Sequence, residues 1–178
     1  MVLFRHGDPR FPFLWESGPQ PPARWHTSQD APCSYYADTP DGAWAELLRH
    51  EGITAEEDLA GIARRLWAVE VPEEVLRAAG RPALPDTVLL GPLSSYPACQ
   101  QEAGRLRDGG AVAMLAPSAA LISGGARGQQ VDAGLQEAAA RDGVVLVLFG
   151  GSWPQLRGWA ASALGAPTAR LLALVRPL

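Results

Sequence analysis

CSYYADTPDGAWAELLRH, residues 33–50, joins a strand-forming segment directly to a helix-forming one. Aromatic side chains favour strands, so residues 33–37 predict a short strand. Asp38 or Thr39 can act as the N-cap of a helix whose first turn accommodates Pro40. An apolar stripe with helical spacing follows, formed by Ala43, Trp44, Leu47 and Leu48. The stretch therefore predicts a strand followed at once by an amphipathic helix.

Glu46 lies outside the apolar stripe of this predicted helix. At about 100° per residue it falls about 130° from the centre of the stripe, so it points away from the packing face. A carboxylate in this position is free to face a cleft. The alternative interpretation is a solvated carboxylate that pairs with Arg49 or His50, three and four residues further along the helix.

Two polar residues precede Glu46 at equal intervals, because Tyr35 stands eleven residues before it and Arg24 eleven residues before Tyr35. The planar guanidinium of an arginine matches phosphate oxygens two at a time and keeps its charge at physiological pH. A tyrosine can stack on an aromatic ring while its hydroxyl forms a hydrogen bond, and a carboxylate can stabilise positive charge that develops on a sugar. The combination suits a nucleotide substrate, although residues of these types are common in any chain of this length.

These residues resemble the core signature of the RES-domain family, which consists of a Gly-Arg-Trp, a Tyr-Leu-Ala and an Ala-x-x-Glu. The matching segments are Arg24-Trp25, Tyr35, Ala37-Asp38-Thr39 and Ala43-Trp44-Ala45-Glu46. The similarity continues outside the core in Phe4-Arg5, Gly109-Gly110-Ala111-Val112, Pro117-Ser118-Ala119 and Val147-Leu148-Phe149. The segments occur in the family's order and together extend over residues 2–150.

Three positions depart from this signature. Ala23 replaces the glycine before the arginine, His26 stands where an asparagine is usual, and Tyr36 replaces a leucine. Two tyrosines therefore stand side by side, and either can be the functional one. The interval of eleven residues to Glu46 favours Tyr35, and strand alternation sends Tyr36 to the opposite face.

The resemblance implies an α+β fold of one domain over residues 1–178, similar to ADP-ribosyltransferases, with mixed sheets, flanking helices and an NAD-binding cleft between two small sheets. It also implies cleavage of the nicotinamide–ribose bond of NAD by phosphorolysis or hydrolysis, the activity of toxins from bacterial toxin–antitoxin pairs. The alternatives are an ADP-ribosyltransferase that acts on a protein target and a RES-like module that binds a nucleotide or a partner without turnover.

The resemblance further assigns roles to individual residues. Arg24 is expected to hold the diphosphate of NAD or an incoming phosphate, and Tyr35 to position nicotinamide. Glu46 is expected to bind the ribose hydroxyls and to counter the charge that grows at the anomeric carbon. Arg5 and Ser118 are weaker candidates for substrate binding, with an edge-strand surface arginine and a turn or N-cap serine as the alternative interpretations.

The resemblance also bears on the cofactor and the partner of the chain. Nicotinamide leaves NAD as a neutral group, so it can depart without a general acid. We expect no metal and no true cofactor, with NAD as the substrate and inorganic phosphate as the co-substrate in the case of phosphorolysis. The partner implied by the resemblance is a Xre-type antitoxin, and the chain is compatible with a homo-oligomer or with a hetero-oligomer that contains this antitoxin.

Length and composition are typical of one enzyme domain: 178 residues, of which 47% are hydrophobic, give ample material for a core. A net charge of −4 offers no support for a nucleic-acid-binding surface. Two cysteines and three histidines show neither a disulfide framework nor zinc-like spacing, which favours a reducing cytoplasm. No signal peptide is visible, and the longest apolar run, residues 144–149, is far shorter than the roughly twenty residues that cross a bilayer.

The remaining elements are predicted from periodicity and turn residues. Thr54 and Glu57 resemble a capping box that opens a short helix. Further helices are expected at 97–107, 132–141 and 154–164, and further strands at 66–71, 111–115, 144–149 and 169–175. The proline-rich residues 11–23 are expected to form a loop over the cleft, because each proline removes a hydrogen-bond donor from any ladder.

Overall fold

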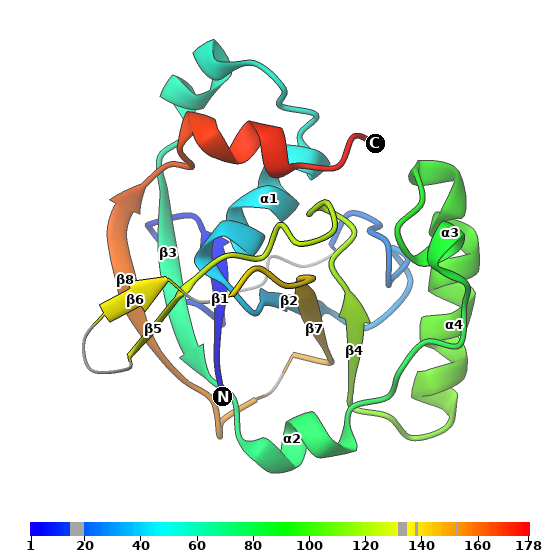
Figure 1. Cartoon of the computed structure of the whole chain (residues 1–178). Helices are drawn as coiled ribbons and strands as arrows, with labels where there is room; N and C mark the ends of the chain where they lie inside the picture. The colour runs from blue at the N-terminus through cyan, green and yellow to red at the C-terminus, as the bar shows by residue number, and fades with distance from the viewer. Residues whose placement is uncertain (15–19, 132–134, 138, 152) are drawn as a thin grey trace.

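The computed structural model describes residues 1–14, 20–131, 135–137, 139–151 and 153–178. Its strands are β1 (Val2–Gly7), β2 (Cys33–Ala37), β3 (Arg64–Glu70), β4 (Ala113–Pro117), β5 (Gln129–Val131), β6 (Leu135–Glu137), β7 (Val144–Phe149) and β8 (Arg157–Gly165). Its helices are α1 (Pro40–His50), α2 (Glu73–Ala78), α3 (Asp86–Leu89) and α4 (Tyr96–Asp108), with 3₁₀ segments η1 (Glu56–Gly61), η2 (Leu93–Ser95) and η3 (Ala169–Leu174). An antiparallel sheet in the order β4-β7-β2-β1-β3-β8 forms the centre, and β5 pairs with β6 separately (Figure 1). The predicted α+β class is confirmed.

The six-stranded sheet consists of two halves that meet at one seam. β1 pairs with β3 through six residue pairs, and β2 pairs with β7 through five. Between β1 and β2, both fully described, the ladder contains a single pair, Phe4 with Ala37. Beyond that pair the two strands are not joined, so a β1-β3-β8 half and a β4-β7-β2 half diverge. The resemblance implied a cleft between two small sheets, whereas the structure has one six-stranded sheet with a narrow seam near its centre.

Helix α1 begins directly after β2, as the sequence predicted. Thr39 is the N-cap, since its side chain accepts a hydrogen bond from the backbone N–H of Gly42 at 3.0 Å, and Pro40 follows in the first turn. Asp38 has a different task, because its carboxylate accepts a hydrogen bond from the backbone N–H of Val144 at 3.1 Å and so ties the connection to β7. The predicted apolar stripe of α1 is buried.

Apolar clusters on both faces of the sheet fix the helices. Along β7, Leu146 and Leu148 face one cluster while Val145 and Val147 face another, as the alternation of a strand requires. The face of Val145 and Val147 carries α3 and α4, which lie beyond β4 at the side opposite β8 (Figure 1). On the same face, α1 and η3 share a further cluster that includes Leu171. α1 therefore packs near the seam pair Phe4–Ala37, and the α3–α4 pair packs on β4 and β7.

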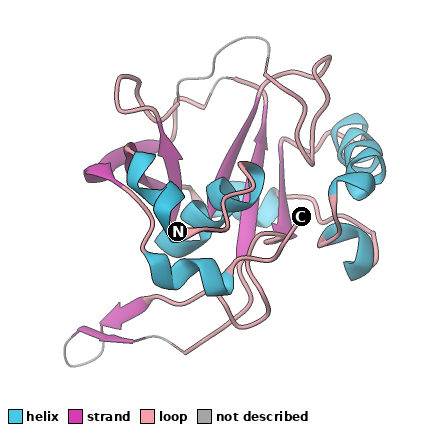
Figure 2. Ribbon diagram, turned by 90° about the horizontal axis from the view of Figure 1, so that it is seen from above, coloured by secondary structure: helices cyan, strands magenta, loops and turns pink. Residues whose placement is uncertain are grey.

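Three expectations for the later part of the chain are wrong. Residues 154–164 were expected to be helical but contribute most of β8, because pairing with β3 outweighs the helix propensity of an alanine-rich segment. The strand expected at residues 169–175 is absent; η3 covers residues 169–174 instead, with Leu171 buried against α1. The expected helix at 132–141 contains β6 of a hairpin that projects from the body (Figure 2). Residues 132–134 and 138 of that expected helix lie outside the described residues.

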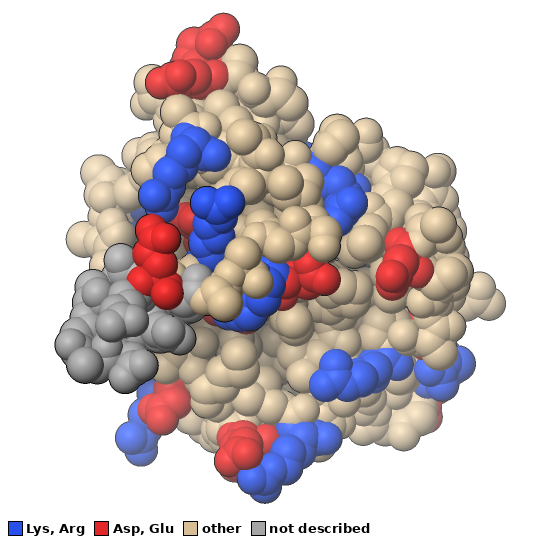
Figure 3. All heavy atoms as spheres, in the orientation of Figure 1, with Lys and Arg blue, Asp and Glu red and all other residues tan. Residues whose placement is uncertain are grey.

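Smaller differences concern the loops. Ala55 rather than Thr54 precedes η1 and makes no side-chain cap, so the predicted capping box is wrong. The proline-rich segment lines the pocket through Gln20, Pro21 and Ala23, while residues 15–19 lie outside the described part. No helix within the described residues is long and apolar enough to cross a membrane. On the face drawn in Figure 3, acidic and basic side chains of the described residues are interspersed rather than separated by sign.

Candidate active site

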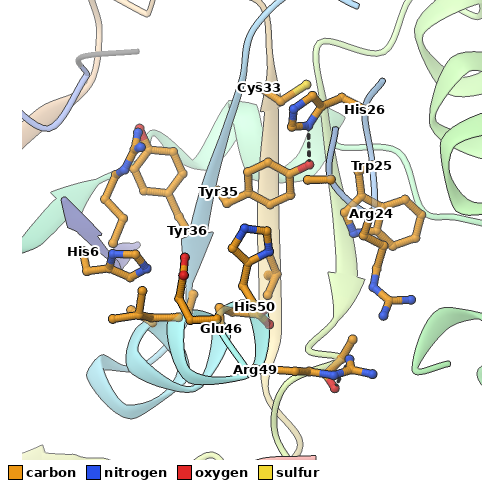
Figure 4. A pocket seen from close by; sticks show the side chains of 18 of the residues that line it. His6, Arg24, Trp25, His26, Cys33, Tyr35, Tyr36, Glu46, Arg49 and His50 are labelled. Carbon is orange, nitrogen blue, oxygen red and sulfur yellow. Dashed lines mark hydrogen bonds between the residues drawn. The ribbon is translucent and has the colours of Figure 1, made fainter. Parts of the chain in front are cut away.

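A pocket of about 400 Å³ opens over the seam between β1 and β2. Arg24 from the loop before β2, Tyr35 from β2 and Glu46 from α1 all line it (Figure 4). Its volume falls within the range of about 300–1,000 Å³ that is usual for small-molecule sites. The three residues singled out by their spacing therefore converge on one cavity, although they come from a loop, a strand and a helix.

Glu46 is half-buried and points from α1 into the pocket, as the helical periodicity predicted. Its Oε1 accepts a hydrogen bond from the hydroxyl of Ser118 at 2.8 Å. Burial raises the pKa of the Glu46 carboxyl, whereas the Ser118 hydroxyl and the charges of Arg49 and Arg24 oppose the rise. The alternative of an ion pair with Arg49 is wrong, since the Arg49 guanidinium donates to main-chain carbonyls instead. The carboxylate is therefore held by Ser118 while its side chain faces the pocket.

Tyr35 is held by a short chain of hydrogen bonds. Its hydroxyl lies 2.7 Å from Nδ1 of His26, and Nε2 of the same ring lies 3.0 Å from the carbonyl oxygen of Pro21. A carbonyl only accepts, so Nε2 carries a hydrogen, and in the neutral ring Nδ1 accepts from the Tyr35 hydroxyl. Burial raises the pKa of Tyr35 well above its usual value, which keeps this hydroxyl protonated. The aromatic ring of Tyr35 is thereby fixed in the pocket.

Arg24 is 7% exposed and is anchored on the far side of the pocket. Its guanidinium donates to the carbonyl oxygen of Gly91 at 2.7 Å, to the Ser95 hydroxyl at 3.0 Å and to the carbonyl oxygen of Val88 at 3.3 Å. It also lies 4.7 Å from the ring centroid of Tyr96. Carbonyls and an aromatic ring orient this cation but do not neutralise it.

Comparison with known proteins bears on the family and the fold of the chain. The model of the family described as "RES domain" matches residues 3–131. The chain belongs to the RES-domain family. A chain of the M. tuberculosis MbcT–MbcA toxin–antitoxin complex is similar over 97% of this chain and 86% of that one, with a TM-score of 0.58 and 18% identity, which is a likeness of fold. No curated protein matches the sequence.

This chain has two adjacent tyrosines where the RES signature has a tyrosine and a leucine, and their side chains point in different directions. The Tyr36 side chain is 1% exposed and packs in the core cluster with Leu3 and Val69, although Tyr36 also borders the pocket. The Tyr35 side chain points into the pocket (Figure 4). The guanidinium of Arg5 lies 5.4 Å from the ring centroid of Tyr36, and Arg5 also lines the pocket. Strand alternation therefore sends the two rings to opposite faces of β2, with Tyr35 facing the pocket and Tyr36 packed in the core.

Ser118, the other weak candidate, lies behind Glu46 rather than among the lining residues. It is 4% exposed and, besides donating to Glu46, its hydroxyl oxygen accepts from the backbone N–H groups of Ala120 at 3.3 Å and Leu121 at 3.4 Å. The serine thus combines the predicted turn role with the support of the RES-family glutamate. The structure points to Ser118 as a positioning residue.

Sequence reasoning missed two histidines of the site. His26 was noted only as a departure from the RES signature, yet it anchors Tyr35. His6 stacks on Trp44 at 5.9 Å between ring centroids, and its Nδ1 accepts a hydrogen bond from Nε of Arg64 at 2.9 Å. Burial and the neighbouring charges of Arg64 and Arg5 lower the pKa of His6 to about 3. Because Nδ1 accepts, the neutral ring carries its hydrogen on Nε2, where it can donate to a ligand.

Metal-ligating side chains do not gather in the part of the chain that the structure describes. The described residues contain no group of three or more His, Cys, Asp or Glu side chains that could hold a metal ion. Cys33 and Cys99 are both buried, and neither forms a disulfide with a described residue.

Proposed function

We propose that this protein cleaves NAD at the bond between nicotinamide and ribose and serves as the toxin of a bacterial toxin–antitoxin pair. The observation that carries the proposal is the convergence of Arg24, Tyr35 and Glu46 on one pocket within a RES domain. Each residue supplies one requirement of the reaction: a cation for phosphate, an aromatic ring for nicotinamide and an anion for the sugar.

The reaction proceeds by rupture of the C1–N bond, whose electron pair passes to the nicotinamide nitrogen and neutralises its charge. Positive charge then grows on the ribose, as in the transition state of glycoside cleavage. Glu46 is placed to stabilise this charge, because its carboxylate is aimed into the pocket and oriented by Ser118. An oxygen of water or of inorganic phosphate completes the reaction by forming the new bond to C1 and releasing any surplus proton to solvent.

A nicotinamide-release assay tests the proposal. Purified protein is incubated with NAD, with and without inorganic phosphate, and nicotinamide is quantified by chromatography. Appearance of ADP-ribose 1″-phosphate identifies phosphorolysis, ADP-ribose identifies hydrolysis, and label transfer from NAD to a protein identifies an ADP-ribosyltransferase. Saturable NAD binding without loss of NAD over long incubation would contradict the enzymatic proposal and identify a binding module.

The proposed partner is a Xre-type antitoxin that blocks the pocket. Support comes from the RES fold and from the similar chain, which was crystallised in a toxin–antitoxin complex. Expression of this chain in a bacterial cytoplasm, its proposed compartment, should lower cellular NAD and arrest growth. Coexpression with a helix-turn-helix protein encoded beside it should restore both, whereas coexpression with an unrelated helix-turn-helix protein should not.

A further inference from the structure

Arg49 is the second buried arginine that lines the pocket, and it is not part of the RES signature. It is 5% exposed, lies on α1 three residues after Glu46, and lines the cavity. Its Nη1 donates to the carbonyl oxygen of Ala119, and its Nη2 donates to the carbonyl oxygens of Gly91 at 2.8 Å and Leu90 at 3.3 Å.

Arg49 and Arg24 meet at one atom. The carbonyl oxygen of Gly91 accepts from Nη2 of Arg24 at 2.7 Å and from Nη2 of Arg49 at 2.8 Å, so two guanidinium groups are immediate neighbours. Figure 4 shows them on the same side of the pocket. Gly91 itself leaves no room for a side chain there, because a Cβ would approach the carbonyl oxygen of Thr87 to 2.6 Å.

This pair carries charge that the described residues do not neutralise by contact. Neither arginine forms an ion pair with a described carboxylate, in contrast to Arg107, which contacts Asp30 at 2.9 Å. Burial and the charge of Arg24 lower the pKa of Arg49. Adjacent like charges removed from water are unfavourable unless an anion joins them.

An unused donor supplies an independent observation. Nε of Arg49 is buried and has no hydrogen-bond partner among the described residues, an arrangement that is rare because an unsatisfied buried donor destabilises the fold. Carbonyl partners hold the rest of the guanidinium in place, so the group is preorganised rather than mobile. A phosphate group offers the several acceptor oxygens and the negative charge that two such forks require.

We propose that Arg49 and Arg24 together form a two-arginine site for a phosphate group, and that Arg49 is a second phosphate-binding residue of the pocket. The proposal deepens the proposed function, on which it rests for the identity of the ligand. The phosphate group belongs either to the diphosphate of NAD or to the inorganic phosphate that attacks the ribose, and binding experiments separate these sources.

Isothermal titration with inorganic phosphate and, separately, with ADP-ribose tests the site without any turnover. Arg49→Gln should weaken binding of the ligand that occupies the site about tenfold to a hundredfold, because it removes charge-assisted hydrogen bonds. Arg49→Lys should recover only part of the affinity, since an ammonium cannot reproduce the fork. Arg77→Gln, which removes the same charge from an exposed ion pair with Glu73 outside the pocket, should bind as the unmodified protein does.

Loss of phosphate affinity alone identifies an attacking-phosphate site, and loss of ADP-ribose affinity alone identifies a diphosphate site. A folded Arg49→Gln protein with unchanged affinity for both ligands would overturn the proposal, and Arg49 would then be only a clamp between α1 and the carbonyls that it holds. If Arg49→Gln does not fold, unchanged affinity in Arg49→Lys overturns the proposal in the same way. Because these readouts need no catalysis, they remain valid even if nicotinamide release is absent and the proposed function fails.

Discussion

Glu46→Gln separates the charge of the proposed catalytic carboxylate from its size and its hydrogen bond. Glutamine retains an oxygen that can accept from the Ser118 hydroxyl, now 2.8 Å from Oε1 of Glu46. Only the negative charge disappears. Removal of one preorganised group that stabilises transition-state charge is worth about 2.7–4 kcal/mol, so we expect kcat to fall about 100- to 1,000-fold.

The stability of the same variant should change in the opposite direction. Burial raises the pKa of Glu46 in the folded protein above its value in the unfolded chain. Between these two pKa values, the folded protein holds a proton on the Glu46 carboxyl that the unfolded chain has released. The free energy of unfolding therefore falls as pH rises through this window, and at neutral pH the ionised carboxylate is unfavourable for the fold. Glutamine removes the penalty, and Glu46→Gln should be at least as stable as the unmodified protein at pH 7.

Two assays check this pair of expectations. Nicotinamide release as a function of pH should lose its acid limb in Glu46→Gln, because that limb reports protonation of the carboxylate. Urea unfolding at pH 7 gives the stability. Activity within threefold of the unmodified protein would refute the catalytic assignment, and a loss of more than about 2 kcal/mol would refute the charge-penalty reasoning and indicate a structural carboxylate.

Three further perturbations probe the surroundings of the site. Tyr35→Phe removes the hydrogen bond to His26, so urea unfolding should show a loss of about 1–3 kcal/mol in the free energy of unfolding. Nicotinamide release should stay closer to normal in Tyr35→Phe than in Tyr35→Ala, because the ring remains, and equal activity in both variants would contradict the stacking role. Ser118→Ala removes a hydrogen bond that lowers the pKa of Glu46, so the acid limb of the pH–rate profile should move to higher pH, and an unmoved limb would contradict the positioning role. His6 has a pKa of about 3 in the folded protein, so its contribution to stability is complete above about pH 6.5 and declines by up to about 1.4 kcal/mol for each pH unit below that. Urea midpoints should therefore fall more steeply between pH 6.5 and pH 5 for the unmodified protein than for His6→Gln. Parallel curves would contradict a buried neutral ring.

Local sequence information was sufficient for the β2–α1 unit. A strand, an N-cap at Thr39 and an apolar stripe are properties of neighbouring residues, and the direction of Glu46 follows from the helical repeat alone. The separation of Tyr35 from Tyr36 follows from strand alternation. Local periodicity was therefore enough to orient two of the three proposed catalytic side chains.

Contacts between segments that are distant in the sequence could not be predicted from local periodicity. Residues 157–165 form a strand because β3 offers an edge about a hundred residues earlier, and no local pattern records that edge. Helical spacing offered Arg49 or His50 as an alternative partner of Glu46, but Arg49 donates to the carbonyl oxygens of Leu90, Gly91 and Ala119 instead. His26 offered a signal in its departure from the family signature, yet only the fold brings its ring to Tyr35.

The distribution of charge connects these observations. The chain carries a net charge of −4, yet the described residues that line the pocket include the four arginines Arg5, Arg24, Arg49 and Arg64, against two carboxylates, Glu46 and Glu51. Positive potential concentrated in one concave site attracts an anionic ligand, while the negative remainder of the surface discourages binding elsewhere. Glu46 stands within that positive region with its pKa raised by burial, so the fold maintains an unfavourable carboxylate beside cations that it does not contact. The arginines and the carboxylate are both stabilised by a ligand that is anionic at its phosphates and cationic at its reacting sugar. The proposed substrate NAD has this charge pattern at the moment its nicotinamide departs.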